Sequence, residues 1–175
     1  MDYLERYEIP LNGMKMGSHR FEFKAGKKFF EQIENTEIKE GSVDVVVDLV
    51  REERLMDLHF DLVGKVVVPC DRCNEPIEVE IKGKERLILK LGDRFEEEDD
   101  EIQIIPESLH TINLTPFIYE YIALLIPVRK VHPEDAQGNS QCNPEILKKL
   151  RELNEKKEVD PRWEALNKLK NNSEN

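Results

Sequence analysis

Four side chains in this sequence have the types that bind zinc, and they occur as two pairs. Cys70 and Cys73 are separated by two residues, the spacing of a tight turn that aims two thiolates at one metal ion. His132 and Cys142 form the second pair, with nine residues between them. The four together would complete a tetrahedral Cys3His shell, which makes them a candidate structural zinc site. A gap of 58 residues separates the pairs, so the pattern indicates a zinc site less strongly than two neighbouring Cys-x2-Cys turns would.

The Cys-x2-Cys pair has two other interpretations. A redox pair needs its first thiol at a helix N-terminus, where the helix dipole and the amide groups lower the thiol pKa. Here the pair follows a strand pattern and precedes Asn74, Glu75 and Pro76, which favour a turn. A plain hairpin turn with reduced cysteines and no metal stays open beside the zinc interpretation. Three cysteines are too few for the disulfide framework of a secreted scaffold, and an odd number cannot all be paired within one chain.

Catalytic motifs are absent from the sequence. It contains no Gly-x-Gly-x-x-Gly or Gly-Lys-Ser/Thr phosphate loop, no Gly-x-Ser-x-Gly elbow and no His-Glu-x-x-His pair. Asp57, His59 and Asp61 would share one face of a strand, as an acid–base or metal constellation would. Alternate residues of every strand share a face, however, and a solvated face has the same pattern. We therefore expect no enzymatic activity and no small-molecule substrate.

Charge is distributed unevenly along the chain. The net charge is −11, but residues 148–175 hold eight basic and six acidic side chains, a balance of +2, which leaves −13 for residues 1–147. An acidic chain does not attract nucleic acid overall, so any RNA contact must be local. One basic set brackets the Cys turn, and a second lies near the C-terminus beside an aromatic ring that could stack on a base. The candidate RNA-binding or partner-binding residues are Arg72, Lys82, Lys84 and Arg86 in the first set and Arg162, Trp163 and Lys168 in the second.

The elements that must position these residues can be read from apolar periodicity. Alternation with a period of two predicts strands over 42–51, 55–68 and 77–91, with a hairpin joining the first two and a bulge or bend at Gly83. Shorter strands are expected over 3–11 and 17–24, and a short helix over 27–33. Helical spacing behind a proline predicts three further helices. They begin at Thr115-Pro116, with Thr115 as the N-cap, at Asn143-Pro144 and at Asp160-Pro161.

An acidic run stands between the strand patterns and the helical patterns. Seven of the nine residues from Asp93 to Glu101 are acidic, and such a run predicts a solvated loop. We therefore predict an α+β fold, with a mainly antiparallel β-sheet or partly open barrel, a packed helix and a helical C-terminal tail. The expected domains are a β-rich core with the Cys turn at 1–142 and a helical extension with a disordered end at 143–175.

The N-terminus and the apolar stretches predict a cytoplasmic protein. The first residues lack the basic and apolar regions of a secretory signal. The longest apolar stretch, residues 117–128, contains Glu120 and is shorter than the roughly 20 residues that a bilayer span needs. We expect no association with a membrane.

Several segments, taken in order, resemble the bacterial YceD family, the large ribosomal RNA subunit accumulation proteins. The resemblance covers roughly residues 40–170 and combines a Cys-x2-Cys turn with a characteristic Asp-Pro-Arg closing segment. The segments are Val66 to Cys73, Asn113-Leu114 leading into a helix that closes on Ile126-Pro127-Val128, the pair His132 and Cys142, and Asp160 to Leu169.

The resemblance implies a non-enzymatic factor that supports synthesis, processing or accumulation of large-subunit ribosomal RNA. On this interpretation the partner is that RNA or a ribosomal protein. The Cys turn, with His132 and Cys142, anchors the C-terminal segment, and the basic residues near the turn contact the partner. The alternative is an acidic adaptor that docks a basic ribosomal protein or a nuclease without touching RNA. The alternative agrees better with the net charge of −11.

Overall fold

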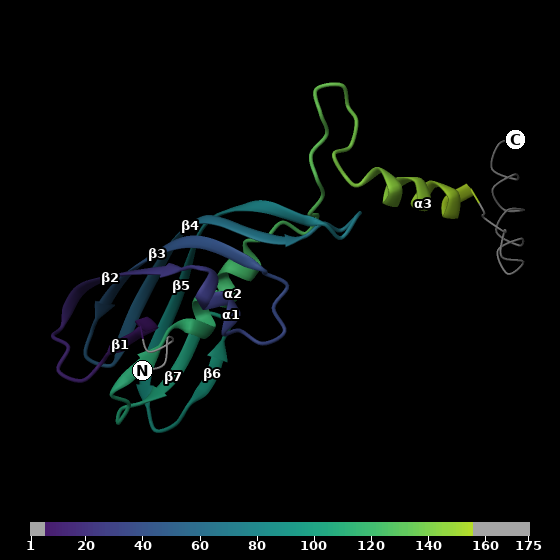
Figure 1. The fold of residues 1–175 in the computed structure, drawn as a ribbon. Coiled ribbons are helices and arrows are strands. Elements are labelled where there is room, and N and C mark those ends of the chain that lie inside the picture. Colours follow the sequence, from purple (N-terminus) through teal and green to yellow (C-terminus); the bar gives the residue numbers. More distant parts are fainter. Residues whose placement is uncertain (1–5, 156–175) are drawn as a thin grey trace, which may run out of the picture. The chain divides into compact units, whose positions relative to one another are not determined.

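An antiparallel ladder of three long strands organises the computed structural model, which describes residues 6–155 (Figure 1). The strands are β3 (Glu40–Arg51), β4 (Leu55–Pro69) and β5 (Pro76–Gly92), and each pairs with the next along the chain. Alternation along β3 buries Val43, Val45, Val47 and Leu49 and turns the residues between them outward. The three predicted strands and the predicted hairpin between the first two are confirmed.

The main sheet extends on both sides of this ladder. β2 (Gly17–Ala25) pairs antiparallel with β3. On the other side β7 (Ile102–Pro106) lies parallel to β5, and β6 (Glu96–Asp99) pairs antiparallel with β7. The order is β2-β3-β4-β5-β7-β6, so β2 and β6 are edges and the sheet is open, not closed into a barrel.

The prediction of a solvated loop over the acidic run was wrong at its centre, where Glu96–Asp99 forms β6. All four side chains of this edge strand are exposed, so the carboxylates stay in solvent while the backbone pairs with β7. β7 has only five residues, too few for a clear period in the sequence. The chain therefore returns to the sheet after the acidic run and does not become helical there.

A second, two-stranded sheet pairs β1 (Glu8–Pro10) with β8 (Thr111–Asn113). The facing residues Ile9 and Ile112 are both buried and belong to the main core. β1 is shorter than the strand predicted over 3–11, and residues 3–5 lie outside the described part of the chain. β8 was not predicted, since three residues carry no periodic signal.

Two helices pack on the buried face of the main sheet. α1 (Lys27–Glu31) buries Phe29 and Phe30, and α2 (Thr115–Leu124) buries Ile118 and Ile122. These four side chains form one hydrophobic core with the inward residues of the strands. Burial of apolar area on both sides of the contact is what holds the layers together.

The N-cap of α2 lies one residue earlier than predicted. Leu114 is the N-cap, and Thr115 is the first helical residue. The amide of Thr115 donates to Asn113 Oδ1 at 2.8 Å, so Asn113 supplies the capping oxygen expected from Thr115. Pro116 stays in the first turn, where its missing N–H leaves no helical hydrogen bond unmade.

α3 (Pro144–Glu155) begins at Asn143-Pro144 as predicted. Asn143 Oδ1 accepts the amide of Glu145 at 2.9 Å, an N-terminal cap beside the proline. The helix predicted from Asp160-Pro161 and the predicted disordered end lie outside the described residues. The chain divides into two compact units between Val131 and His132. The domain boundary predicted at 142–143 stays a prediction.

These elements confirm the predicted α+β class in its mainly antiparallel form. Within residues 6–155, no helix combines the length and the apolar character that crossing a bilayer requires.

Gly83 marks close packing and not the predicted bulge. The register between β4 and β5 passes through the Leu62–Gly83 pair without a shift. A Cβ atom at Gly83 would collide with the side chain of Leu125, the residue that ends α2. The missing side chain therefore lets the end of α2 approach β5 closely.

We expect Gly83→Val to lower the free energy of unfolding by about 1–3 kcal/mol, because the added methyl groups overpack the contact with Leu125. Urea denaturation measures the change. The double variant Gly83→Val/Leu125→Ala should recover part of the loss, since it removes the colliding group. A single variant as stable as the wild type would contradict this account of the contact.

Candidate metal centre

The Cys turn joins β4 to β5, and backbone hydrogen bonds close it. Cys70 donates its amide to the carbonyl of Glu75 at 2.8 Å, and Asn74 donates to the carbonyl of Cys70 at 2.8 Å. Asn74 has a φ of 60°, a left-handed conformation that Asn tolerates better than most residues. The pair Pro69–Pro76 ends the ladder, so the turn with both cysteines lies at the end of the two longest strands.

Both cysteines of the turn are buried, and a backbone amide donates to one of the two sulfurs. The amide of Arg72 donates toward Cys70 Sγ at 3.5 Å. Cys70 and Cys73 are 2% and 6% exposed. The chain continues from the turn into β5 without a helix, so the helix terminus that activates a redox Cys-x2-Cys pair is missing at this turn.

A second set of contacts holds the Cys turn against the segment that precedes His132. The backbones of Asp71 and Lys130 meet, with the amide of Asp71 donating to the carbonyl of Lys130 at 2.7 Å. The amide of Lys130 donates in return to Asp71 Oδ2 at 2.6 Å. Lys130 Nζ lies 3.3 Å from Glu37 and 3.6 Å from Asp71. The hydrogen bond to Glu37 is the main cause that raises the pKa of the Lys130 side chain, and the nearby charge of Asp71 acts in the same direction.

The spacing of His132 and Cys142 follows from a closed loop. An isolated antiparallel bridge pairs Glu134 with Ser140, and His132 and Cys142 each lie two residues outside it. Asp135 Oδ1 accepts the amides of Gln137 and Asn139 at 2.9 and 2.7 Å. These hydrogen bonds lower the pKa of the Asp135 carboxyl, and the bond from Asn139 has the largest effect. The amide of Cys142 donates to Ser140 Oγ at 3.2 Å. The loop therefore brings together two ligands that are ten positions apart.

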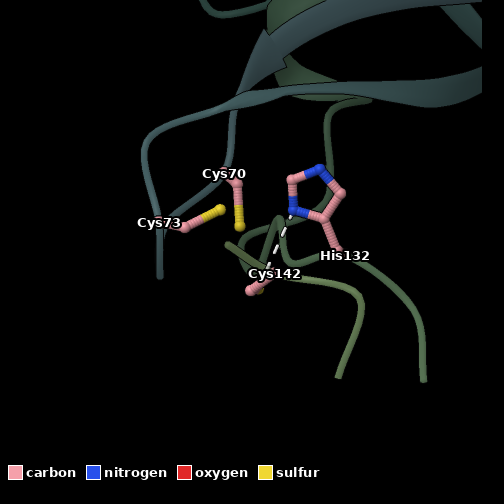
Figure 2. Close-up of side chains that lie close together, drawn as sticks. All are labelled: Cys70, Cys73, His132 and Cys142. Carbon is pink, nitrogen blue, oxygen red and sulfur yellow. Dashed lines mark hydrogen bonds between the residues drawn. The ribbon is translucent and has the colours of Figure 1, made fainter. Parts of the chain in front are cut away.

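The predicted ligands form one cluster. One ligand atom from each of Cys70, Cys73, His132 and Cys142 lies within 4.8 Å of the corresponding atom of every other member. Figure 2 shows the four side chains pointing toward one another. Cys142 Sγ lies 3.8 Å from His132 Nδ1. Cys142 is 3% exposed, so all three thiols are buried.

The donor set fits zinc. Three thiolates and one imidazole suit a soft tetrahedral site, whereas magnesium and calcium prefer oxygen ligands. Zinc–sulfur bonds of about 2.3 Å place neighbouring tetrahedral sulfurs about 3.8 Å apart. The upper limit of 4.8 Å on the separations of the ligand atoms accommodates that value. Four protein ligands would fill the shell and leave no position for a water or a substrate, which is the pattern of a structural site.

The constellation of Asp57, His59 and Asp61 is part of an ion-paired face of the sheet. Arg86 donates two hydrogen bonds to the carboxylate of Asp57, at 2.9 and 2.8 Å, and these lower the pKa of Asp57. His59 Nε2 lies 3.3 Å from Asp57, and Lys84 Nζ lies 3.5 Å from Asp61. The three residues share a face because of strand alternation, and the two carboxylates pair with basic residues of the neighbouring strand β5.

The structure does not gather the first basic set at the Cys turn. Lys82, Lys84 and Arg86 share the outward face of β5, but Lys82 is six residues beyond the start of that strand, or about 20 Å along it. Lys84 and Arg86 are ion-paired with carboxylates of β4, whereas Arg72 lies in the turn itself. The second set, Arg162, Trp163 and Lys168, lies outside the described residues.

Sequence reasoning missed the residues that support the candidate ligands. Asp71 stands inside the Cys-x2-Cys turn, and an acidic residue there is a weak local signal for a capping role. Its partner Lys130 is 59 positions away, and only the fold brings the two together. Gly138, with a φ of 82°, is in the loop expected between the two later ligands, and Asp135 could have been recognised as a turn residue there.

The fold and the cluster together define a class: an α+β protein with a Cys3His knuckle at the end of a long β-hairpin. The sequence model of the family described as large ribosomal RNA subunit accumulation protein YceD matches residues 58–170, more than half of the chain. The chain belongs to the YceD family, as the sequence resemblance had indicated. Searches of the curated proteins and of the solved structures returned no match.

Replacing Asp71 with Ala should lower the free energy of unfolding by about 1–2 kcal/mol, because the amide of Lys130 loses its acceptor and the ammonium loses a partner. Asp71→Asn keeps an acceptor oxygen and should cost less. Thermal and urea denaturation of both variants, beside Asp93→Ala in the acidic run as a control, measure the difference. Equal stability of Asp71→Ala and the control would show that this contact does not hold the turn.

Proposed function

We propose that this protein is a non-enzymatic cytoplasmic factor that supports large-subunit ribosomal RNA synthesis, processing or accumulation. The observation that carries the proposal is membership of the YceD family over residues 58–170. The family description names accumulation of this RNA and no catalysed reaction. Consistent with that role, the one group of potential metal ligands found among the described residues has the ligand types of a structural site.

The proposed metal is one zinc ion held by Cys70, Cys73, His132 and Cys142. Zinc would supply a cross-link between the Cys turn and the loop that precedes α3, and it would take no part in a reaction. The chain's own contacts position the ligands: the backbone amide of Arg72 donates to Cys70 Sγ, and Asp71 holds Lys130, two residues before His132. The free energy of zinc binding would then add to the stability of both segments.

Two versions of the partner contact follow. In the first, Arg72, Lys82, Lys84, Arg86, Arg162, Trp163 and Lys168 meet ribosomal RNA directly. In the second, the protein is an acidic adaptor that docks a basic ribosomal protein or a nuclease and does not touch RNA. The ion pairs of Lys84 with Asp61 and of Arg86 with Asp57 favour the second version, since phosphates would have to displace carboxylates already in place.

Zinc removal should destabilise the protein, and the change His132→Ala should reproduce the effect. We expect about one zinc per chain by elemental analysis of protein purified without chelator, and a loss of several kcal/mol of stability on chelation or in Cys70→Ser. His110→Ala, which changes a histidine outside the cluster, is the matched control and should keep both zinc and stability. Identical melting with and without chelator would count against the metal.

Depletion of the protein in its host should lower the ratio of large-subunit to small-subunit ribosomal RNA, and the wild-type chain should restore it. Gel or sequencing quantification of both RNAs provides the measurement. An unchanged ratio after complete depletion would overturn the proposed function. A salt-titrated filter assay with ribosomal RNA then separates the two versions, because RNA retained by the purified chain supports direct contact and RNA lost at all salt concentrations supports the adaptor.

A further inference from the structure

An open groove of about 880 Å³ lies within the first compact unit, and residues of α2 and of the β6–β7 edge of the main sheet line it. Its apolar lining includes large side chains that are mostly exposed to solvent. Phe95 is 59% exposed and Leu124 is 68% exposed, and both line the groove with the partly buried Phe117 and Leu109. Large apolar side chains exposed together beside a groove mark a binding surface more often than a solvated one.

The groove is strongly acidic. Six carboxylates line it, contributed by β5, by the β6–β7 hairpin and by α2, and they are Glu85, Glu97, Asp99, Asp100, Glu101 and Glu120. None of the six forms an ion pair with another residue in the described range 6–155. The single basic residue of the lining, Arg86, directs its guanidinium to Asp57 on the opposite face of the sheet.

The pKa of Tyr121 reflects its burial and the negative charge of the groove. Burial raises the pKa of its phenol to about 12, and the negative charges of Glu120, Glu85 and Glu101 act in the same direction. Each of those three carboxylates lines the groove. A cation entering the groove would therefore meet a negative potential on an apolar floor, where the effective dielectric constant is below that of water.

Protection of the sheet edge does not account for this arrangement. Charges on β6 would discourage another chain from pairing there, which explains Glu97 and Asp99. Glu85 is different, because Ile81 and Leu87, which have the same parity on β5, are buried, so Glu85 faces the α2 side of the sheet. This half-buried carboxylate lines the groove together with Glu120 of α2 and does not protect the β6 edge.

We propose that this groove binds a basic peptide segment of a partner protein, in which Lys or Arg residues flank a bulky apolar side chain. The apolar side chain would lie against Phe117 and Leu124 while the flanking cations pair with the carboxylates. This inference rests on the adaptor version of the proposed function, and it identifies the docking surface and the partner chemistry. RNA phosphates would be repelled by the six carboxylates, and a second copy of this chain has a net charge of −11, so its overall charge is also repelled.

The test measures binding of a fluorescent synthetic peptide, in which Lys and Arg flank a central Leu-Phe pair, to the full-length zinc-loaded chain by anisotropy. The double variant Glu97→Lys/Glu120→Lys reverses one charge on each side of the groove and should weaken binding about tenfold or more. Glu31→Lys/Glu53→Lys changes the net charge equally at exposed sites outside the lining and should bind nearly as the wild type does. Equal weakening in both variants would mean general charge attraction only and would overturn the proposal.

A second pair of variants tests the apolar contact. Leu124→Ser should weaken binding about fivefold, because an apolar side chain no longer covers the peptide. Leu153→Ser, on α3, changes a leucine of nearly the same exposure, 69% against 68%, and should leave binding unchanged. Binding of spermidine, or of a peptide with Ser-Ser in place of Leu-Phe, as tight as that of the original peptide would overturn a peptide-specific site. Competition by ribosomal RNA for the groove would overturn it as well.

Failure of this inference and failure of the proposed function give different results. If the groove is wrong but the function is right, the wild-type chain restores the ribosomal RNA ratio after depletion while peptide binding is absent or insensitive to Glu97→Lys/Glu120→Lys. If the function is wrong, depletion leaves the RNA ratio unchanged whatever the peptide does. Support for both requires the groove variant to lose peptide binding and to fail to restore the RNA ratio that the control variant restores.

Discussion

The antiparallel ladder between β4 and β5 determines where nearly every other feature lies. Its register runs from Leu55–Lys90 to Pro69–Pro76 without a shift. One face of the ladder supplies buried residues such as Phe60 and Leu87 to the core, and the other carries the ion pairs of Asp57 and Asp61. A slip by one residue would exchange the two faces, so burial of the apolar face holds the register. The same register places the Cys turn at the end of the ladder.

The candidate metal centre depends on this constraint and on two local devices. Hydrogen bonds within the turn aim Cys70 and Cys73, and the Glu134–Ser140 bridge spaces His132 and Cys142. The contact between Asp71 and Lys130 joins the turn to the chain just before His132. Each device uses backbone donors or acceptors of the chain itself to hold the segments that carry the ligands. Segments held in this way would leave less conformational entropy for metal binding to offset.

Charge is organised in two different ways on the two faces of the sheet. On the outward face the basic residues of β5 meet carboxylates of β4, so the surface is mixed and locally neutral. Beside α2 and the β6–β7 edge, six carboxylates that form no ion pair within residues 6–155 line a groove with exposed apolar side chains. The net charge of −11 is therefore not spread evenly over a solvated surface. The acidic groove is the feature that ordinary folding stability explains least, which is typical of binding surfaces.

The sequence by itself determined the long strands, the turn that carries Cys70 and Cys73, the start of α3 and membership of the family. These are local signals, because alternation, turn residues and short motifs act between near neighbours. The tertiary structure decided the rest: that Glu96–Asp99 joins the sheet through β7, that Gly83 makes room for Leu125, and that Lys84 and Arg86 are ion-paired. It also placed His132 and Cys142 beside the Cys turn. Such contacts join residues tens of positions apart, and their geometry follows from register and packing, which no local pattern encodes.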